Sequence, residues 1–316
     1  MRRVALIYNP ASGQYSATRG DVVRRVMAVL RDAGIEAEAL ETKAPGSARA
    51  LASAAVRNGY DTILAGGGDG TVHEILQCLV GTPVALGVIP LGTANALAQD
   101  LGLGRSPVKA VRALLHASPT QVHVGHIFYR DDKGADCSRY FTVAAGVGVD
   151  ALLMSRLDAG LKRRFGYALY IVEAIRIWAT NPFPLFEASF QVNGNPEPRV
   201  EQVSQLLAVR VRSFGGVLRT LAPGANLRNG WLHLVAFRTR SRLSYLKFLL
   251  AVIAGRQTFS SEVSLLEAVS VDCQSVKGSP APVYVEADGE VLGTLPVRIE
   301  VAPQLLTLLV PPSARS

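Results

Sequence analysis

Gly66-Gly67-Gly68-Asp69-Gly70-Thr71 is the stretch that decides the fold of this chain. It follows an apolar run at 62–65 and precedes a helix-like stretch at 72–80. A strand, a glycine turn and a helix start form a cradle for phosphate, because glycines let the backbone approach a ligand and the first helical turn points free N–H groups at an anion. An ordinary glycine-rich turn capped by Asp69 has the same spelling, so the hexapeptide alone leaves both interpretations open.

The carboxylate of Asp69 distinguishes this loop from the better-known phosphate loops. A bare carboxylate repels phosphate, so it belongs there if Mg²⁺ or a proton to be abstracted lies nearby. No G-x-x-x-x-G-K-[ST] sequence occurs, which excludes a Walker-type P-loop. A G-x-G-x-x-G frame starting at Gly66 fails at Thr71, and one starting at Gly68 fails at His73, so the dinucleotide fingerprint is absent.

Strands alternate with helices over the first part of the chain. The expected strands are 4–8, 35–40, 62–65 and 85–89, and the expected helices are 21–32, 48–58, 72–80, 94–101 and 108–117. Short connections between them indicate a parallel sheet covered on both faces, in which ligands bind at the carboxyl ends of the strands. Those ends carry Asn9, Thr42, Gly67 to Thr71, and Gly92-Thr93. We therefore predict one nucleotide site shared by four loops.

The pattern changes after about residue 121. Strand-like segments follow at 121–129, 139–149, 186–192, 204–211, 231–238, 262–271, 283–286, 297–301 and 305–310, with helical stretches at 167–179 and 243–254. The predicted fold class is therefore α/β plus mainly β. A doubly wound parallel-sheet nucleotide domain covers 1–121, and an antiparallel β-rich domain covers 122–316. Whether the last strand returns to the first domain stays open.

Composition and charge bound the function. The chain has 316 residues, 49% of them apolar and only 18% charged, which indicates a folded protein. Its three cysteines show no C-x-x-C spacing and suit a reducing, cytoplasmic compartment. No apolar run is long enough for a membrane span. Residues 156–256 hold 15 Lys/Arg against 5 Asp/Glu, a net +10, which either attracts an anionic partner or is an ordinary solvated basic face.

Five segments together resemble a known family. The hexapeptide at 66–71 resembles the GGDGT loop of the diacylglycerol kinase catalytic superfamily, which includes bacterial lipid kinases, sphingosine and ceramide kinases and, more distantly, NAD kinases. Four other segments are similar to that family, in its order: Asn9-Pro10-Ala11-Ser12-Gly13, Pro90-Leu91-Gly92-Thr93-Ala94-Asn95, Ala145-Gly146-Val147-Gly148-Val149-Asp150-Ala151 and Asp288-Gly289-Glu290. Each match alone is weak, but five in order over nearly the whole chain are poorly explained by chance.

The resemblance implies an ATP- and Mg²⁺-dependent lipid kinase, with a diacylglycerol-like lipid as the first choice and ceramide or a sphingoid base as the second. Asp69 would orient Mg²⁺ or the transferring phosphoryl group. Asp288 and Glu290 would lie across the cleft and include the base for the lipid hydroxyl, and Asp150 would contact the substrate. The residues implied for ATP are Asn9, Ser12, Thr42, Gly67, Gly68, Asp69, Gly70, Thr71, Thr93 and Asn95. Asp288-Gly289 also has the sequence of a plain hairpin turn.

The sequence departs from the family in places. Asn229 stands where metal-carrying members have an Asp, which puts a structural Mg²⁺ site in doubt, and Ala96 replaces the Asp of the usual bacterial loop. Asn95-Ala96 looks more like the long-chain-base and ceramide kinases. His123 and His126 lack further ligands at metal spacing, so zinc is not expected there.

The remaining expectations concern partners. Lys162-Arg163-Arg164 beside Phe165 and Tyr167 suits the headgroup layer of an anionic membrane, which predicts peripheral attachment. The alternative is a basic loop before a core helix. Nucleic acid is not expected, because the aromatics do not recur at base-stacking spacings. An NAD kinase and a non-catalytic nucleotide- or lipid-binding membrane regulator remain the rival functions, and a homodimer stays open.

Overall fold

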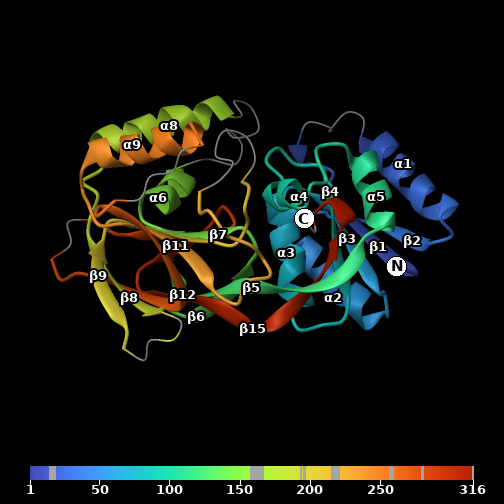
Figure 1. Ribbon diagram of the computed structural model, residues 1–316. Helices are drawn as coiled ribbons and strands as arrows, with labels where there is room; N and C mark the ends of the chain where they lie inside the picture. The colour runs from blue at the N-terminus through green and yellow to red at the C-terminus, as the bar shows by residue number, and fades with distance from the viewer. Residues whose placement is uncertain are drawn as a thin grey trace. The chain divides into compact units, whose positions relative to one another are not determined.

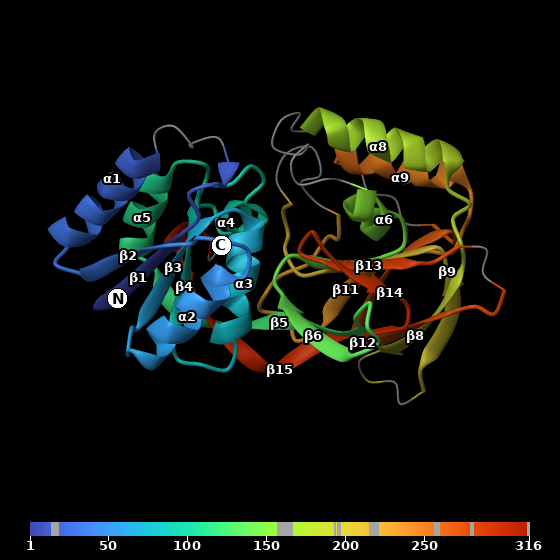
Figure 2. The same ribbon diagram turned by 180° about the vertical axis from the view of Figure 1, so that it is seen from behind.

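The computed structural model describes residues 1–13, 19–156, 167–192, 194, 197–214, 221–255, 260–278 and 281–314. The chain divides into two compact units, which are described separately (Figures 1 and 2). Unit 1 comprises Met1–Val124, Pro303–Ser316 and a short segment that begins at Ser213, and unit 2 comprises most of the residues between. Two long strands, β5 (Ser118–Arg130) and β15 (Val297–Val310), contribute residues to both units.

Unit 1 contains the predicted parallel sheet. Its strands are β1 (Arg3–Tyr8), β2 (Glu36–Glu41), β3 (Thr62–Gly67) and β4 (Ala85–Pro90), in the order β4-β3-β1-β2. All neighbours run parallel, and the end of β15 joins β4 in parallel at Leu308 and Leu86. Every residue of β3 and β4 is buried, as expected of strands covered on both faces.

Among the described residues, three helices connect these strands: α1 (Arg19–Asp32), α2 (Ser47–Arg57) and α3 (Asp69–Leu79). The helices α4 (Ala96–Asp100) and α5 (Pro107–Leu115) follow β4. α1 packs with α5, and α2 packs with α3. One boundary matters for function. β3 extends through Gly67 and α3 begins at Asp69, so Asp69 and Thr71 lie in the first turn of a helix, where the sequence predicted a loop up to residue 71.

Unit 2 is antiparallel and β-rich, as predicted. Its strands are β6 (Asp136–Phe141), β7 (Ala144–Val147), β8 (Phe186–Val192), β9 (Arg199–Val203), β10 (Gln205–Val209), β11 (Leu232–Phe237), β12 (Val263–Ser275), β13 (Tyr284–Ala287) and β14 (Glu290–Thr294). The main order is β14-β13-β7-β10-β11-β12-β15, β8 bridges β12 and β9, and β5 pairs with β6. Phe141, Phe186 and Phe190 lie fully buried in its core.

The described part of unit 2 contains three helices: α6 (Val149–Arg156), α8 (Tyr167–Thr180) and α9 (Arg242–Ile253). The expected strand 139–149 was wrong, because the chain forms β6 and β7 there and α6 begins at Val149. Strands β9 and β14 were not predicted, and the segments 297–301 and 305–310 form one strand, β15. Among the residues that the structure describes, no helix is long and apolar enough to cross a membrane.

Candidate functional site

The loops predicted to share a site in unit 1 follow the carboxyl ends of its parallel strands. Asn9 follows β1, Thr42 follows β2, and the glycine and 91–95 loops follow β3 and β4. The strand order reverses between β1 and β3, which is where open α/β sheets bind ligands. The backbone N–H of Asn9 donates to the carbonyl of Gly66 at 2.9 Å, and that of Thr42 donates to Tyr8 at 2.9 Å.

Three of these loops touch through glycines. A Cβ on Gly92 would overlap the Cα of Gly68, and a Cβ on Gly13 would overlap the carbonyl oxygen of Leu91. The N–H groups of Leu91 and Gly92 both donate to the carbonyl of Gly67, at 3.0 and 3.1 Å. Any side chain at these positions would push the loops apart, so the glycines here are required by close backbone contact.

The start of α3 is the part of this site whose geometry suits an anion. The helix begins after Gly68, which is extended and supplies no side-chain cap, and Gly70 in its first turn is exposed. The hydroxyl of Ser12 is shielded from solvent and has no hydrogen-bond partner among the described residues. It lies 3.9 Å from where a Cβ of Gly68 would be. Uncapped N–H groups and an unsatisfied hydroxyl together suit phosphate oxygens.

Asp69 holds the neighbouring loop in place. Its Oδ1 accepts from the N–H of Ala96 at 2.7 Å, and its Oδ2 accepts from that of Asn95 at 3.0 Å. Asn95 lies in the left-handed region, with φ 51°, and its side chain exchanges hydrogen bonds with Gly92. A carboxylate on two backbone N–H groups pins the turn before α4 against the first turn of α3.

Not every residue implied for ATP lies in this cluster of contacts. Asn9, Ser12, Gly67, Gly68, Asp69 and Asn95 belong to the three touching loops. Thr71 is buried, with its side chain against Gly67, and Thr93 is exposed. Thr42 is buried at the end of the neighbouring strand. Their roles toward a nucleotide remain predictions.

In unit 2, Asp288-Gly289 forms the tight turn of the β13–β14 hairpin. Ala287 pairs with Glu290, and both turn residues have positive φ, 49° at Asp288 and 84° at Gly289. Asp-Gly is the preferred pair for such a turn. Glu290, half-buried, is thereby fixed as the first residue of β14.

Both oxygens of Asp288 are engaged by backbone donors. Oδ1 accepts from the N–H groups of Val143 and Ala144 at 2.8 and 3.1 Å, and Oδ2 accepts from that of Thr142 at 3.0 Å. The Asp288 N–H in turn donates to the carbonyl of Ala144 at 2.8 Å. Asp288 therefore holds the hairpin against the connection between β6 and β7, and these hydrogen bonds also fix the position of Glu290.

Asp150 lies in the first turn of α6, also in unit 2. Its Oδ1 is shielded from solvent and has no hydrogen-bond partner among the described residues. Burial raises the pKa of this carboxyl to about 7, although backbone N–H groups of the same turn oppose the shift. An unsatisfied buried oxygen of this kind suits a substrate hydroxyl, the role that the sequence resemblance implies.

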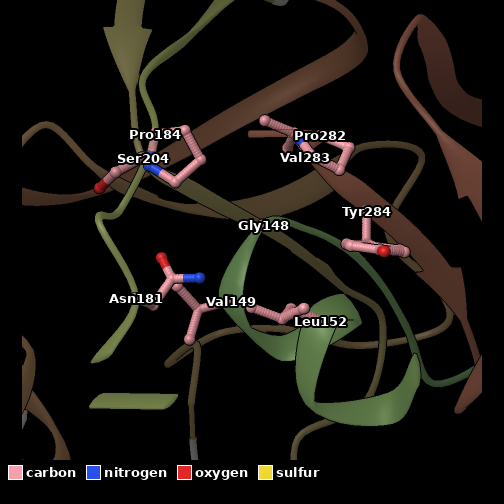
Figure 3. Close-up of a pocket in the computed structure, with 9 residues that line it drawn as sticks. All are labelled: Gly148, Val149, Leu152, Asn181, Pro184, Ser204, Pro282, Val283 and Tyr284. Carbon is pink, nitrogen blue, oxygen red and sulfur yellow. The ribbon is translucent and has the colours of Figure 1, made fainter. Parts of the chain in front are cut away.

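A small pocket lies beside α6 (Figure 3). Its lining comes from the start of α6, the segment after α8 and the start of β13: Gly148, Val149, Leu152, Asn181, Pro184, Ser204, Pro282, Val283 and Tyr284. Most of this lining is apolar, and the hydroxyl of Ser204 lies 2.8 Å from that of Tyr245. Its cavity volume is about 10 Å³, which is about the space that one water molecule needs. This pocket therefore does not hold a lipid.

The turn implied for a structural metal is held by a buried side chain. Arg210 is fully buried and donates to the carbonyls of Leu227 at 3.3 Å, Asn229 at 2.8 Å and Trp231. Burial lowers its pKa to about 10, which leaves it charged at neutral pH. The Asn229 amide donates to Gly224 at 3.1 Å. A guanidinium that occupies these carbonyls repels a divalent cation, so the residues present do not fit a structural metal.

For a catalytic Mg²⁺, unit 1 supplies the carboxylate of Asp69. The described residues contain no cluster of three His, Cys, Asp or Glu side chains suited to a metal. Mg²⁺ in phosphoryl-transfer sites is commonly held by one or two carboxylates together with substrate phosphates and water. Asp69 fits a metal brought in with a nucleotide.

His126 of β5 stacks on Tyr140 with 4.3 Å between ring centroids, and burial lowers the pKa of its imidazole.

Sequence reasoning missed Arg210 and the Ser204–Tyr245 pair. The signal for Arg210 was available, because it is a single cation inside the apolar strand-like run at 204–211, where an unpaired charge would be costly. Ser204 and Tyr245 are 41 residues apart, and no local pattern joins them.

A doubly wound sheet with glycine loops at its switch point, followed by an antiparallel β unit, is an NAD kinase-like fold. Residues 3–127 match the diacylglycerol kinase catalytic domain, and residues 142–310 match the YegS C-terminal NAD kinase beta sandwich-like domain. The chain is 28% identical over 312 residues to a diacylglycerol kinase of Mycobacterium tuberculosis, covering 98% of this chain and 95% of that protein. It is 30% identical over 290 residues to the "Probable lipid kinase YegS-like" of Chromohalobacter salexigens, covering 90% and 86%.

Two solved structures share the fold. A diacylglycerol kinase from Bacillus anthracis superposes with a TM-score of 0.68 at 19% identity, over 99% of this chain and 98% of that one. Yeast NADH kinase complexed with NADH superposes with a TM-score of 0.52 at 11% identity, over 98% and 83%. The chain therefore belongs to the diacylglycerol kinase catalytic-domain superfamily. It is a lipid kinase with an NAD kinase-like fold, and its family implies ATP as co-substrate and a lipid as acceptor.

Proposed function

We propose that this lipid kinase transfers the γ-phosphoryl group of ATP, with Mg²⁺, to a hydroxyl of a membrane lipid, and that a diacylglycerol-like lipid is its main substrate. The observation that carries the proposal is the anion site of unit 1, where the uncapped start of α3 and the unsatisfied Ser12 hydroxyl lie between glycine loops in backbone contact. The relatives named diacylglycerol kinase support the choice of lipid.

The nucleotide phosphates would bind at the N–H groups of Gly68 to Gly70 and the hydroxyl of Ser12. Asn9 and Thr42, at the ends of β1 and β2, would contact the rest of the nucleotide, with Thr71, Thr93 and Asn95 completing the site. Mg²⁺ bound by Asp69 and the phosphates would neutralise the charge of the transferring group. Asp69 would bind Mg²⁺ while its oxygens also hold the loop at 95–96.

Glu290 is the favoured general base. The two oxygens of Asp288 are engaged by the N–H groups of residues 142–144, so Asp288 is better suited to position the hairpin than to take a proton. Glu290, at the start of β14, would accept the proton of the lipid hydroxyl as the hydroxyl attacks phosphorus. Asp150, with its unsatisfied oxygen, would contact the lipid.

Two other substrates are candidates. Asn95-Ala96 supports ceramide or a sphingoid base, and the fold shared with the yeast NADH kinase suggests NAD, although that likeness is one of fold alone. A non-catalytic regulator would bind nucleotide or lipid without turnover.

We expect the enzyme to work at the cytoplasmic face of a membrane, as a peripheral protein, and its phosphorylated product to feed phospholipid synthesis. The basic segment predicted to reach the headgroups runs from Leu161 to Tyr167. Residues 161–166 lie outside the described residues and Tyr167 begins α8, so the role of this segment stays a prediction from sequence. Neither nucleic-acid binding nor a homodimer is tested by the fold.

The deciding experiment is incubation with γ-labelled ATP, Mg²⁺ and a panel of diacylglycerol, ceramide, sphingoid base and NAD, followed by identification of the labelled product. Labelled phosphatidic acid as the main product supports the proposal. Labelled ceramide phosphate or labelled NADP as the main product would make ceramide or NAD the substrate instead. If no acceptor becomes labelled, the result favours a non-catalytic regulator.

A further inference from the structure

The helices α8 and α9 of unit 2 form a pair with an unusual outer face. They lie side by side in both views (Figures 1 and 2). The indole N–H of Trp178 donates to the carbonyl of Arg242 at 2.9 Å, and the Arg242 Nε donates to the carbonyl of Trp178 at 2.8 Å. These reciprocal hydrogen bonds fix the end of α8 against the start of α9.

α9 is apolar on the side that faces solvent as well as on the side that faces the core. Ser244, Phe248 and Val252 are buried, at the i, i+4 and i+8 positions of one narrow stripe. Large apolar side chains occupy the opposite side, with exposed fractions from 36% to 57%: Leu243, Leu246, Leu249, Leu250 and Ile253. A helix that is apolar all round is normally covered on every side.

α8 extends the same exposed apolar surface. Val172 is 63% exposed and Ile175 is 59% exposed, and Trp178 contributes part of its ring. Eight of the eleven large hydrophobic residues exposed among the described residues belong to α8 and α9. Such a concentration marks an interaction surface, because isolated exposed apolar residues are scattered on ordinary proteins.

The charged residues on and beside α8 and α9 indicate what covers their exposed apolar face. Residues 238–255 contain Arg238, Arg240, Arg242 and Lys247 and no carboxylate, and of these cations Arg238 pairs with Glu201 of β9. The one acid of α8 is Glu173, which forms ion pairs with Arg156 at 3.2 Å and Arg176 at 3.8 Å. Apolar side chains bordered by cations are typical of helices that lie in the interface of an anionic bilayer. A self-complementary protein contact would pair these cations with carboxylates, which neither helix offers beyond Glu173.

We propose that the exposed faces of α8 and α9 dock on an anionic lipid bilayer, with the apolar side chains below the headgroups and Lys247 and Arg242 among them. This docking surface depends on the proposed function only for its biological purpose, because docking would hold the enzyme where its lipid substrate resides. α9 has 12 residues, or about 18 Å of helix, so it would lie in the membrane plane and not span it.

The test compares two residues of equal exposure. Leu250 on α9 and Val200 on β9 are each 55% exposed. Co-sedimentation with vesicles of phosphatidylcholine and phosphatidylglycerol (3:1) should fall about fivefold for Leu250→Gln, fall about thirtyfold for Leu249→Gln with Leu250→Gln, and stay unchanged for Val200→Gln. Lys247→Glu should weaken binding to these vesicles by about tenfold and leave binding to pure phosphatidylcholine vesicles unchanged.

Several controls keep this proposal separate from the proposed function. Unfolding midpoints must match the unsubstituted protein, and turnover on a short-chain, dispersed lipid should not change in any variant. Equal vesicle binding by Leu250→Gln and Val200→Gln would overturn the docking surface. Light scattering that shows a dimer lost in the α9 variants, without loss of vesicle binding, would assign the face to a second copy instead. Absence of turnover on every lipid, with vesicle binding retained, would refute the kinase substrate and leave the docking surface standing.

Discussion

Asp69 of unit 1 and Asp288 of unit 2 resemble each other in sequence setting and differ in what surrounds them. Each follows a strand, lies beside a glycine and accepts backbone N–H groups from a neighbouring loop. Asp69 has two such donors and sits in an uncapped helical turn beside an unsatisfied hydroxyl. Asp288 has three backbone donors and sits in a tight hairpin turn.

The difference teaches that a carboxylate in a family motif need not do chemistry. In the proposed function, the surroundings of Asp69 would receive the nucleotide phosphates and the metal that accompanies them. The carboxylate of Asp288 ties two segments of unit 2 together, and Glu290, two residues later, would accept the proton. Replacement of Asp69 should therefore lower kcat more than the free energy of unfolding. Replacement of Asp288 should lower the free energy of unfolding more than replacement of Asp69 does.

The largest effect is expected for Glu290→Gln. The amide keeps the size of the side chain and removes its basicity, so kcat should fall about a thousandfold while the KM for ATP changes less than threefold. Steady-state kinetics on dispersed diacylglycerol measures both, with the exposed Glu267→Gln of β12 as control. A variant that lost ATP affinity and kept kcat would move Glu290 into the nucleotide site.

Asp69→Asn should lower kcat about a hundredfold and leave the protein folded. The amide oxygen can still accept one of the two N–H groups of residues 95 and 96, so the free energy of unfolding should fall by about 1 kcal/mol. Turnover and urea unfolding measure the two quantities. Unchanged turnover would remove Asp69 from the reaction.

Asp288→Asn should lower kcat about tenfold and destabilise the protein by about 2–3 kcal/mol. An amide offers one acceptor oxygen to three backbone donors and turns its own N–H₂ group toward the others. The matched control is Asp131→Asn, since Asp131 accepts from the N–H groups of Lys133 and Ala135 in an exposed turn and should matter little. Full stability with abolished turnover would instead make Asp288 a catalytic group.

The smallest effect on turnover, about fivefold, is expected for Asp150→Asn, whose clearest signature is in pH dependence. Burial raises the pKa of Asp150 from 3.8 to about 7, so the folded protein keeps a proton that the unfolded chain loses. The contribution of Asp150 to the free energy of unfolding is thus fully present below about pH 4. It falls by up to about 4 kcal/mol as the pH rises to about 7. Asn cannot ionise, so the stability of the variant relative to the unsubstituted protein should rise over that range. Parallel urea-unfolding curves from pH 5 to 8 would contradict the shift.

Much of unit 1 was predictable because its signals are local. Apolar runs placed β1, β3 and β4, which are largely buried, and glycine stops and the family motifs placed the helix ends and the loops at the carboxyl ends of the strands. The end of β3 was misplaced because Gly66-Gly67 reads as a loop, whereas both glycines pair with neighbouring strands of the sheet, Gly66 with Tyr8 and Gly67 with Pro90. Unit 2 was harder, since α6 follows a strand without any turn residue except Gly148, and β14 is short and half-exposed.

The roles of Asp288 and Arg210 could not be read from sequence, because their partners are distant or are backbone groups. Asp288 meets residues that lie 144 to 146 positions earlier in the chain. Arg210 binds three carbonyls, which carry no side-chain signature.

The most direct test of this division of labour is the stabilisation that Mg²⁺·ATP confers on the two Asn variants. Unfolding is measured with and without the complex at about a hundred times its dissociation constant for the unsubstituted protein, where binding should add about 2.7 kcal/mol. The account predicts nearly that full increment for Asp288→Asn, from a lower starting stability, and a much smaller one for Asp69→Asn. A full increment for Asp69→Asn together with none for Asp288→Asn would contradict it.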